Sequence, residues 1–186
     1  MPESRAPTPE EVAATVAKLQ FPRPVMSSDA AVKRALELFC ARPAMNHCAP
    51  SVLMALQQAY DLPGGDMLPW VANPFQGGVC TGEICGALSG AAIAMGLMAY
   101  KVLPHDDHNR RLAAMAVLPY VRELTQGFAQ RFGSARCATI TGKDKRTPEE
   151  NARFSKLRQW EQTCGAFVEY VVRAMVARGE TGRLPA

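Results

Sequence analysis

The amino-acid sequence predicts an all-α fold, in which a single domain is built as a bundle of about six or seven helices. Three observations lead to this prediction. The length of 186 residues fits one domain. Apolar residues recur at helical spacing between breaks that are rich in proline and glycine. Strand patterns are nearly missing, because the best candidate, residues 138–141, is very short.

The expected helices follow one another along most of the chain, and proline or glycine marks most of the breaks between them. They span residues 9–20, 30–42, 46–60, 83–102, 108–132 and 147–178, with a short helical turn at residues 66–71 and a glycine-rich loop at residues 73–82. Pro119 is expected to kink or divide the helix that contains it, because a proline inside a helix removes a backbone hydrogen bond.

Capping residues indicate where several of these helices begin. Thr8 and Glu11, and likewise Thr147 and Glu150, have the spacing of a capping box, in which each residue binds the other's backbone amide. Simple caps are expected at Ser28 or Asp29 and at Asp107. These signals make the starts of the helices better defined than their ends.

The predicted helices form one main unit with two short flanking segments. We expect residues 1–27 to be a tail with the short first helix, residues 28–178 the main helical domain, and residues 179–186 a C-terminal tail. Trp70 and Trp160 are expected to be anchors in the core or in the lining of a site.

The charge of the chain says little about its function. There are 21 Lys and Arg against 17 Asp and Glu, a net charge of +4. Much of the excess lies in residues 131–158, which form either a solvated loop and helix face or a docking patch for an acidic protein partner. No aromatic residues interleave with this basic run in the way that is typical of nucleic-acid binding, so we expect no nucleic-acid partner.

The sequence also predicts a cytoplasmic protein without membrane insertion. No apolar segment follows a basic start at the N-terminus. The longest uncharged run near the middle, residues 84–100, is shorter than a membrane span and rich in glycine and alanine. Thiols stay reduced in the cytoplasm, so the six cysteines are expected to be ligands, redox centres or core residues rather than disulfides.

The cysteines do not form any short sequence motif. They stand at Cys40, Cys48, Cys80, Cys85, Cys137 and Cys164. None of the spacings of zinc ribbons, thioredoxins or bacterial ferredoxins occurs. Two of them, Cys48 and Cys85, lie at predicted helix starts, where backbone amides and the helix dipole stabilise a thiolate. Such thiolates suit a metal ligand or a redox nucleophile.

Glycines in the predicted helix 83–102 call for a compensating reason, because each costs about 1 kcal/mol relative to alanine inside a helix. They are Gly86, Gly90 and Gly96. Either another helix packs very close to them or something bulky lies against the backbone. Ser89 lies one turn after Cys85 on the same face of the helix.

Several separate segments together resemble a known family. They are Asn46-His47-Cys48-Ala49, Gln76-Gly77-Gly78, the run from Glu83 through Cys85-Gly86-Ala87-Leu88-Ser89-Gly90 to Ala91, and then Cys137 and Cys164. This pattern is similar to that of the C-GCAxxG-C-C family of small bacterial proteins with a redox character. The resemblance covers about residues 30–175, and its most specific part is the segment that begins at Cys85.

The resemblance implies a function and a set of site residues. The four characteristic cysteines of the family correspond to Cys48, Cys85, Cys137 and Cys164. A related domain occurs in multihaem cytochromes that also carry an iron–sulfur cluster. The resemblance therefore implies a small electron-transfer or redox-sensing protein with one iron–sulfur cluster on these four cysteines, with [2Fe–2S] favoured over [4Fe–4S]. A protein redox partner is expected with it.

Other residues are expected around the cofactor or outside it. The candidates for contact with the cofactor are His47, Cys80, Gly86, Ser89 and Gly90. His47 is either a ligand, a hydrogen-bond donor to the cluster or an exposed residue of the first helical turn. Cys80 is either a replacement ligand, a nearby thiol that senses or repairs the cluster, or inert. Cys40 is expected to be a small buried core residue.

Two further functions remain open at this point. One is a metal-free redox protein in which pairs of these cysteines cycle between thiol and disulfide. The other is a structural zinc module or a helical interaction module. Colour and metal content distinguish all three, because only a cluster protein is brown.

Overall fold

The structure, a computed structural model, describes residues 5–19, 22–41, 47–142, 147–149, 152 and 159–181. Its elements are all helical, which confirms the predicted all-α fold. In chain order they are α1 (Pro9–Lys18), α2 (Ser28–Cys40), α3 (Cys48–Tyr60), α4 (Met67–Ala72), the 3₁₀ turn η1 (Asn73–Phe75), the π turn η2 (Gly78–Gly82), α5 (Gly86–Val102), α6 (Asp107–Phe132), α7 (Cys137–Thr141) and α9 (Gln159–Thr181). None of the described helices is long and apolar enough to cross a membrane.

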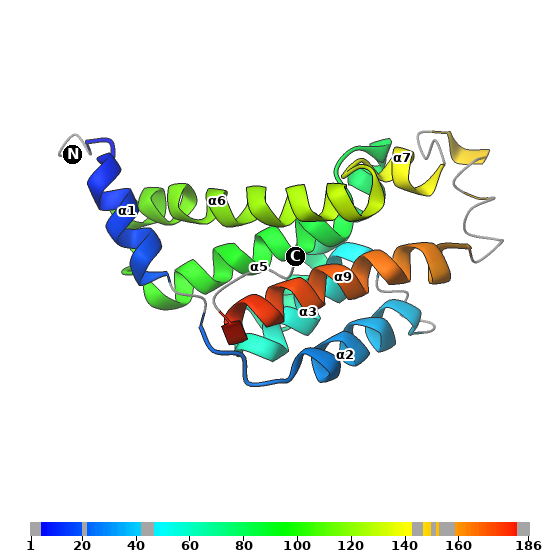
Figure 1. The fold of residues 1–186 in the computed structure, drawn as a ribbon, viewed down its shortest axis with the longest axis horizontal. Coiled ribbons are helices and arrows are strands. Elements are labelled where there is room, and N and C mark those ends of the chain that lie inside the picture. Colours follow the sequence, from blue (N-terminus) through cyan, green and yellow to red (C-terminus); the bar gives the residue numbers. More distant parts are fainter. Residues whose placement is uncertain are drawn as a thin grey trace.

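Helix α3 lies at the centre of the fold and contacts α2, α4, α5 and α9. Its side chains are apolar on nearly every face and most are buried, as expected for a helix that is surrounded by others. Helix α6 runs along α5 on the outside, and α1 crosses the far end of α6, while α2 packs against α3 and α9 (Figure 1). The fold is thus a layered bundle around α3.

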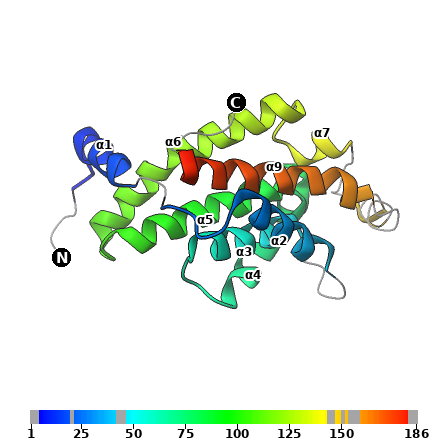
Figure 2. The same ribbon diagram turned by 60° about the horizontal axis from the view of Figure 1, so that its bottom comes forward.

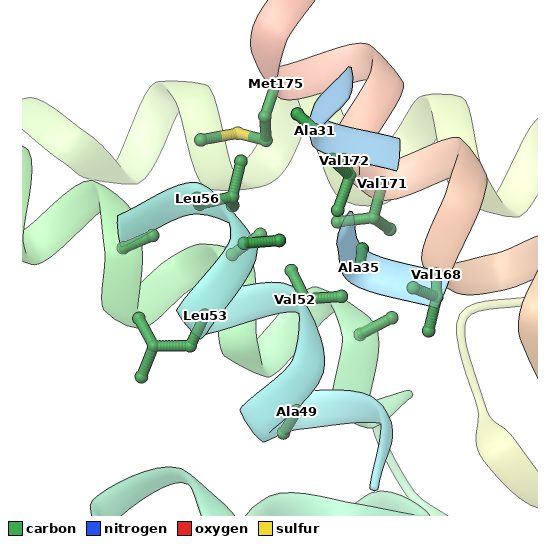
Figure 3. Close-up of a cluster of buried hydrophobic side chains, with 14 of the residues drawn as sticks. Ala31, Ala35, Ala49, Val52, Leu53, Leu56, Val168, Val171, Val172 and Met175 are labelled. Carbon is green, nitrogen blue, oxygen red and sulfur yellow. The ribbon is translucent and has the colours of Figure 1, made fainter. Parts of the chain in front are cut away.

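The main core surrounds α3 and includes residues of α2, α5 and α9, and Figure 3 shows the part of it around α2, α3 and α9. Small residues of α2 face larger ones of the other two helices. The labelled members are Ala31 and Ala35 from α2, Ala49, Val52, Leu53 and Leu56 from α3, and Val168, Val171, Val172 and Met175 from α9. Burying a valine or leucine side chain completely stabilises a fold by about 1.5–3 kcal/mol, so this cluster holds the three helices together.

The helix caps confirm some of the predicted starts and shift others. The capping box of α1 is present: Thr8 Oγ1 accepts from the Glu11 amide at 3.3 Å, and Glu11 Oε2 accepts from the Thr8 amide at 2.8 Å. The predicted caps Ser28 or Asp29, for the second helix, and Asp107, for the long helix, are wrong by one or two residues. Ser27 caps α2, and Asp106 caps α6 by accepting from the Asn109 amide at 2.9 Å. In both cases the extended backbone of the actual cap turns its side chain toward the amide three residues later.

Two local predictions fail, one of them in part. Residues 138–141 belong to α7 and do not form a strand. Pro119 does not divide its helix, because α6 continues through it. A kink at Pro119 stays a prediction, since proline leaves the Met115 carbonyl without its backbone hydrogen bond.

The last helix differs from its predicted span. Helix α9 continues to Thr181, three residues into the predicted C-terminal tail. Tyr60 explains this extension, because its hydroxyl donates to the Met175 carbonyl at 2.6 Å and lies against Gly179. The predicted capping box at Thr147 involves Glu150, which lies outside the described residues.

Candidate cysteine site

Cys85 and Cys137 are held side by side by the backbone. The Cys85 amide donates to the Ala135 carbonyl at 2.9 Å, and the Cys137 amide donates to the Glu83 carbonyl at 2.6 Å. These bonds flank an isolated antiparallel bridge between Ile84 and Arg136. The central helix therefore starts at Gly86 and not at residue 83 as predicted, because residues 83–85 are extended to make this pairing.

A salt bridge reinforces the same pairing from outside. Arg136 binds the Glu83 carboxylate through two nitrogens, Nε to Oε2 at 3.1 Å and Nη2 to Oε1 at 2.8 Å. Both side chains are more than half exposed, so the contribution to stability is small. The geometry still favours the register that aligns the starts of α5 and α7, and each of these helices begins at or directly after a cysteine.

Cys48 reaches the same place from the start of α3. A Cβ atom placed on Gly86 would lie 2.5 Å from Cys48 Sγ and 2.8 Å from the Phe75 carbonyl oxygen. The Cys48 sulfur therefore packs directly on the first turn of α5, next to Cys85. Gly86 is the residue that leaves room for it.

Gly90 allows α3 and α5 to approach each other one turn further along. A Cβ atom on Gly90 would collide with the Ala49 carbonyl oxygen and would lie 3.2 Å from Ala49 Cα. The prediction that one of these two glycines faces a closely packed helix is thus confirmed, at Gly90. Whether Gly86 or Gly90 also contacts a cofactor remains a prediction.

The other three cysteines of the pattern all lie within electrostatic range of Cys85. Burial raises the pKa of the Cys85 thiol well above its ordinary value. The sulfurs of Cys48, Cys137 and Cys164 each raise this pKa further, and the Ala87 amide lowers it. Cys48 and Cys164, the first and last of these cysteines along the chain, therefore both lie in the electrostatic neighbourhood of Cys85. Cys85, Cys137 and Cys164 are buried, and Cys48 is half-buried.

The four thiols do not form a ready site for one metal ion. Among the described side chains, no group of three or more His, Cys, Asp or Glu residues has the arrangement needed to hold a single ion. No disulfide joins any of the six cysteines, all of which the structure describes. The arrangement is a cluster of neighbouring thiols, most of them shielded from water.

The remaining predicted site residues lie at different distances from this cluster. His47 is the N-cap of α3, and its carbonyl accepts from the Ser51 amide and hydroxyl at 3.1 and 2.9 Å. Ser89 is half-buried one turn after Cys85, and its amide donates to the Cys85 carbonyl at 3.2 Å. Neither observation tests a contact with a cofactor.

Cys80 and Cys40 are both exposed. Cys80 is not among the cysteines that act on Cys85. The predicted loop around it is a tight turn, in which Val79 and Cys80 have left-handed backbones with φ of 56° and 57°. Such angles are strained for residues with a side chain. The prediction that Cys40 is buried is wrong, because it is the last residue of α2 and the core-facing stripe ends at Phe39.

The core position expected as one alternative for both tryptophans is wrong for Trp70, and its place in the lining of a site stays a prediction. Trp160 packs edge-on against Phe39 with ring centroids 5.0 Å apart, whereas Trp70 is 80% exposed. The signal that could have revealed this is the shortness of the apolar helix α4, which has only six residues, all apolar. So short a helix on the surface can bury only one of its two faces.

Comparison with known families decides the relationship of the chain. The model of the family described as "Putative redox-active protein (C_GCAxxG_C_C)" matches residues 46–177. The chain belongs to the C-GCAxxG-C-C family. The match begins two residues before Cys48 and extends past Cys164, so it includes the whole cysteine cluster. No curated protein matches the chain significantly, and no solved structure does.

Proposed function

We propose that this C-GCAxxG-C-C protein carries one iron–sulfur cluster on Cys48, Cys85, Cys137 and Cys164 and serves in electron transfer or redox sensing. The observation that supports the proposal is that the backbone pairs the segments of Cys85 and Cys137, while Cys48 Sγ lies against Gly86, the residue after Cys85. Four cysteine thiolates are the usual ligand set of both [2Fe–2S] and [4Fe–4S] clusters, and we favour [2Fe–2S]. A cluster bound there would supply one-electron transfer.

A structural zinc ion and a cluster differ in how far apart they hold their four sulfurs. Zinc needs four ligands at about 2.0–2.3 Å from one point, which brings the sulfurs close to one another. The described side chains form no group of three or more His, Cys, Asp or Glu that could hold a single ion. A cluster places several iron atoms between its ligands, so its sulfurs stand further apart.

The surrounding residues suit a buried redox centre. Cys85, Cys137 and Cys164 exclude water from one side, while half-buried Cys48 is the sulfur nearest to solvent. The Ala87 amide acts on the Cys85 sulfur. Burial and amide hydrogen bonds to sulfur are two of the factors by which proteins set cluster potentials.

Purification without oxygen tests the proposal directly. We expect a brown protein with about two iron and two sulfide per chain, or about four of each for the larger cluster. Serine variants of each of the four cysteines should lose most of the iron. Cys40→Ser is the matched control, because Cys40 is exposed at the end of α2, and it should keep the full spectrum. A colourless wild-type protein without iron would refute the proposal.

Cys80→Ser separates the three possible roles of Cys80. We expect the variant to keep its cluster and to change only its sensitivity to oxygen or thiol reagents, because Cys80 is exposed and does not act on Cys85. Loss of the cluster would show that Cys80 is a ligand and that one of the other four is not.

A second candidate function is metal-free thiol–disulfide exchange, which the contact of Cys48 Sγ with the first turn of α5 favours. Oxidation would join the sulfurs of Cys48 and Cys85 and release two protons and two electrons to a disulfide partner. A colourless protein that reversibly loses two thiols, and does so only when both Cys48 and Cys85 are present, would support this function instead.

For either function we propose a protein redox partner in the cytoplasm, where exposed thiols such as Cys80 stay reduced. An acidic partner would suit the basic run at residues 131–158, much of which lies outside the described residues. Within it, Arg136 is already paired with Glu83. Reaction rates with such a partner should fall as salt is raised.

A further inference from the structure

A surface next to the cysteine cluster is apolar although it faces solvent. It consists of four residues of α4 and η1, which we call the α4 surface: Met67 (62% exposed), Trp70 (80%), Val71 (46%) and Phe75 (36%). Met67, Trp70 and Val71, at i, i+3 and i+4, have the spacing of one helical face, and Phe75 follows in η1. The opposite face of α4 is buried through Leu68 and Ala72.

Helix α4 is therefore apolar all round but covered on one face only. A helix of this kind is normally buried on all sides. In Figure 2, α4 lies at the lower edge of the molecule, outside α3, and no other element is drawn beyond it. Exposed apolar patches of this kind mark interaction sites, and tryptophan is among the residues that contribute most to binding.

The α4 surface is large enough to supply the apolar part of a dimer interface. From the exposed fractions and the roughly 150–250 Å² of a large apolar side chain, its four residues present on the order of 450 Å². A standard interface buries about 800 Å² per partner, of which about 56–65% is apolar. That share is close to the area which the α4 surface offers.

The charges of this region favour a second copy of the same chain over a charged partner. Between Leu62 and Gly82 the only charged residue is Asp66, at the edge of the surface. In a two-fold dimer the same patch meets itself, so like charges near the axis would repel. An uncharged patch avoids that repulsion, whereas it offers an acidic or basic partner nothing to pair with.

We propose that the α4 surface is the contact between two copies of this chain in a two-fold dimer. The proposal is independent of the cofactor. It places the interface beside the cysteine cluster, because the Phe75 carbonyl and Cys48 Sγ both lie within 3 Å of the same point on Gly86.

Light scattering and analytical ultracentrifugation of the full chain test the proposal. We expect a dimer that dissociates on dilution and that high salt does not weaken, because the contact is apolar. Trp70→Ser should weaken the dimer by at least roughly 30-fold, as expected for a central tryptophan. Leu118→Ser is the matched control, since Leu118 is 57% exposed on α6, and it should leave the dimer unchanged.

Tryptophan fluorescence gives a second measurement. In a Trp160→Phe background the emission comes from Trp70 alone, because the chain has 2 Trp. We expect this emission to shift to longer wavelength on dilution, as Trp70 returns to water. A wild-type chain that is monomeric at every concentration would overturn the proposal. So would a dimer that Trp70→Ser leaves intact.

Discussion

The two ends of helix α5 differ in what their glycines contact. At the site end, Gly86 faces the Cys48 sulfur and Gly90 faces the backbone of Ala49. At the other end, nothing lies within 4 Å of a Cβ atom placed on Gly96. Gly96 instead lines a groove of about 400 Å³ between α5 and the start of α6, together with residues that include Tyr100 and His105.

This difference shows that one residue type serves two purposes within a single helix. Each interior glycine costs about 1 kcal/mol relative to alanine. At the site end close packing of α3 and the sulfur of Cys48 offset that cost, so the backbone there tolerates no added atom. At the open end, no contact of Gly96 within the described chain offsets the cost of the glycine. The four predictions below test this contrast, from the largest expected effect to the smallest.

Gly90→Ala should have the largest effect. Its new Cβ meets backbone atoms of Ala49, which cannot move aside as the end of a flexible side chain can. We expect a loss of about 1–3 kcal/mol in the free energy of unfolding, the usual range for overpacking. Urea unfolding of the metal-free protein measures it, and an unchanged midpoint would contradict the close approach of α3 and α5.

Gly86→Ala should damage the site more than the fold. Its Cβ meets Cys48 Sγ, which can shift, and the Phe75 carbonyl oxygen, which as a backbone atom moves less easily, so the cost is about 1 kcal/mol or more. We expect iron loading to fall and the reactivity of Cys48 toward thiol reagents to change, while the helical content stays the same. Iron analysis and alkylation mapping measure both. Full iron loading in this variant would show that the sulfur does not need its present position.

Gly96→Ala should have the opposite sign. Because its Cβ meets no atom, no steric clash opposes the gain in helix propensity, which should stabilise the protein by up to about 1 kcal/mol. The melting temperature is then expected to rise, with iron content unchanged. A fall in melting temperature would mean that the groove is more tightly filled than the described residues show.

Acidification should have the smallest effect, and this effect should be confined to the end of the molecule near Gly96. The Thr8 amide, and then Arg5, lower the pKa of Glu11 from its ordinary value of 4.5. The capping box therefore stabilises α1 fully above pH 4.5 and loses this contribution as the pH falls through the lowered pKa. Hydrogen exchange should show faster opening of α1 and of the start of α6, where the Asn109 amide lowers the pKa of the capping Asp106 in the same way. Thr8→Ala should produce the same change in α1 at neutral pH, and an altered reactivity of Cys48 in that variant would contradict the separation of the two ends.

Much of the fold follows from local signals in the sequence. The capping box at Thr8 and the breaks at proline and glycine depend on neighbouring residues only, and they place most helices within a few residues. The proximity of Cys48, Cys137 and Cys164 to Cys85 is different, since no spacing between them in the sequence implies it. Only the resemblance to a family anticipated it, because tertiary packing brings the four segments together.

The wrong predictions have a common physical cause. Residues 138–141 include Thr139, Ile140 and Thr141, whose branched side chains favour strands, but no partner strand is present for them among the described residues. Trp70 was expected to be a buried anchor or a site-lining residue because it is large and apolar. In each case the residues have the expected local preference, for strand or for burial, but the tertiary packing around them overrides it.

The backbone pairing of residues 83–85 with residues 135–137 has a consequence for the order in which the site is assembled. Synthesis proceeds from the N-terminus, so Cys48 and Cys85 are made, and α3 and α5 can pack, before Cys137 exists. Cys137 joins them only after α6 has returned along α5, which closes a loop of about fifty residues at an entropic cost. Cys164 arrives last, with α9. A nascent chain therefore presents the thiols of Cys48 and Cys85 before those of Cys137 and Cys164. We expect iron to be taken up only after release from the ribosome and folding of α9. Absorbance during refolding can follow this uptake.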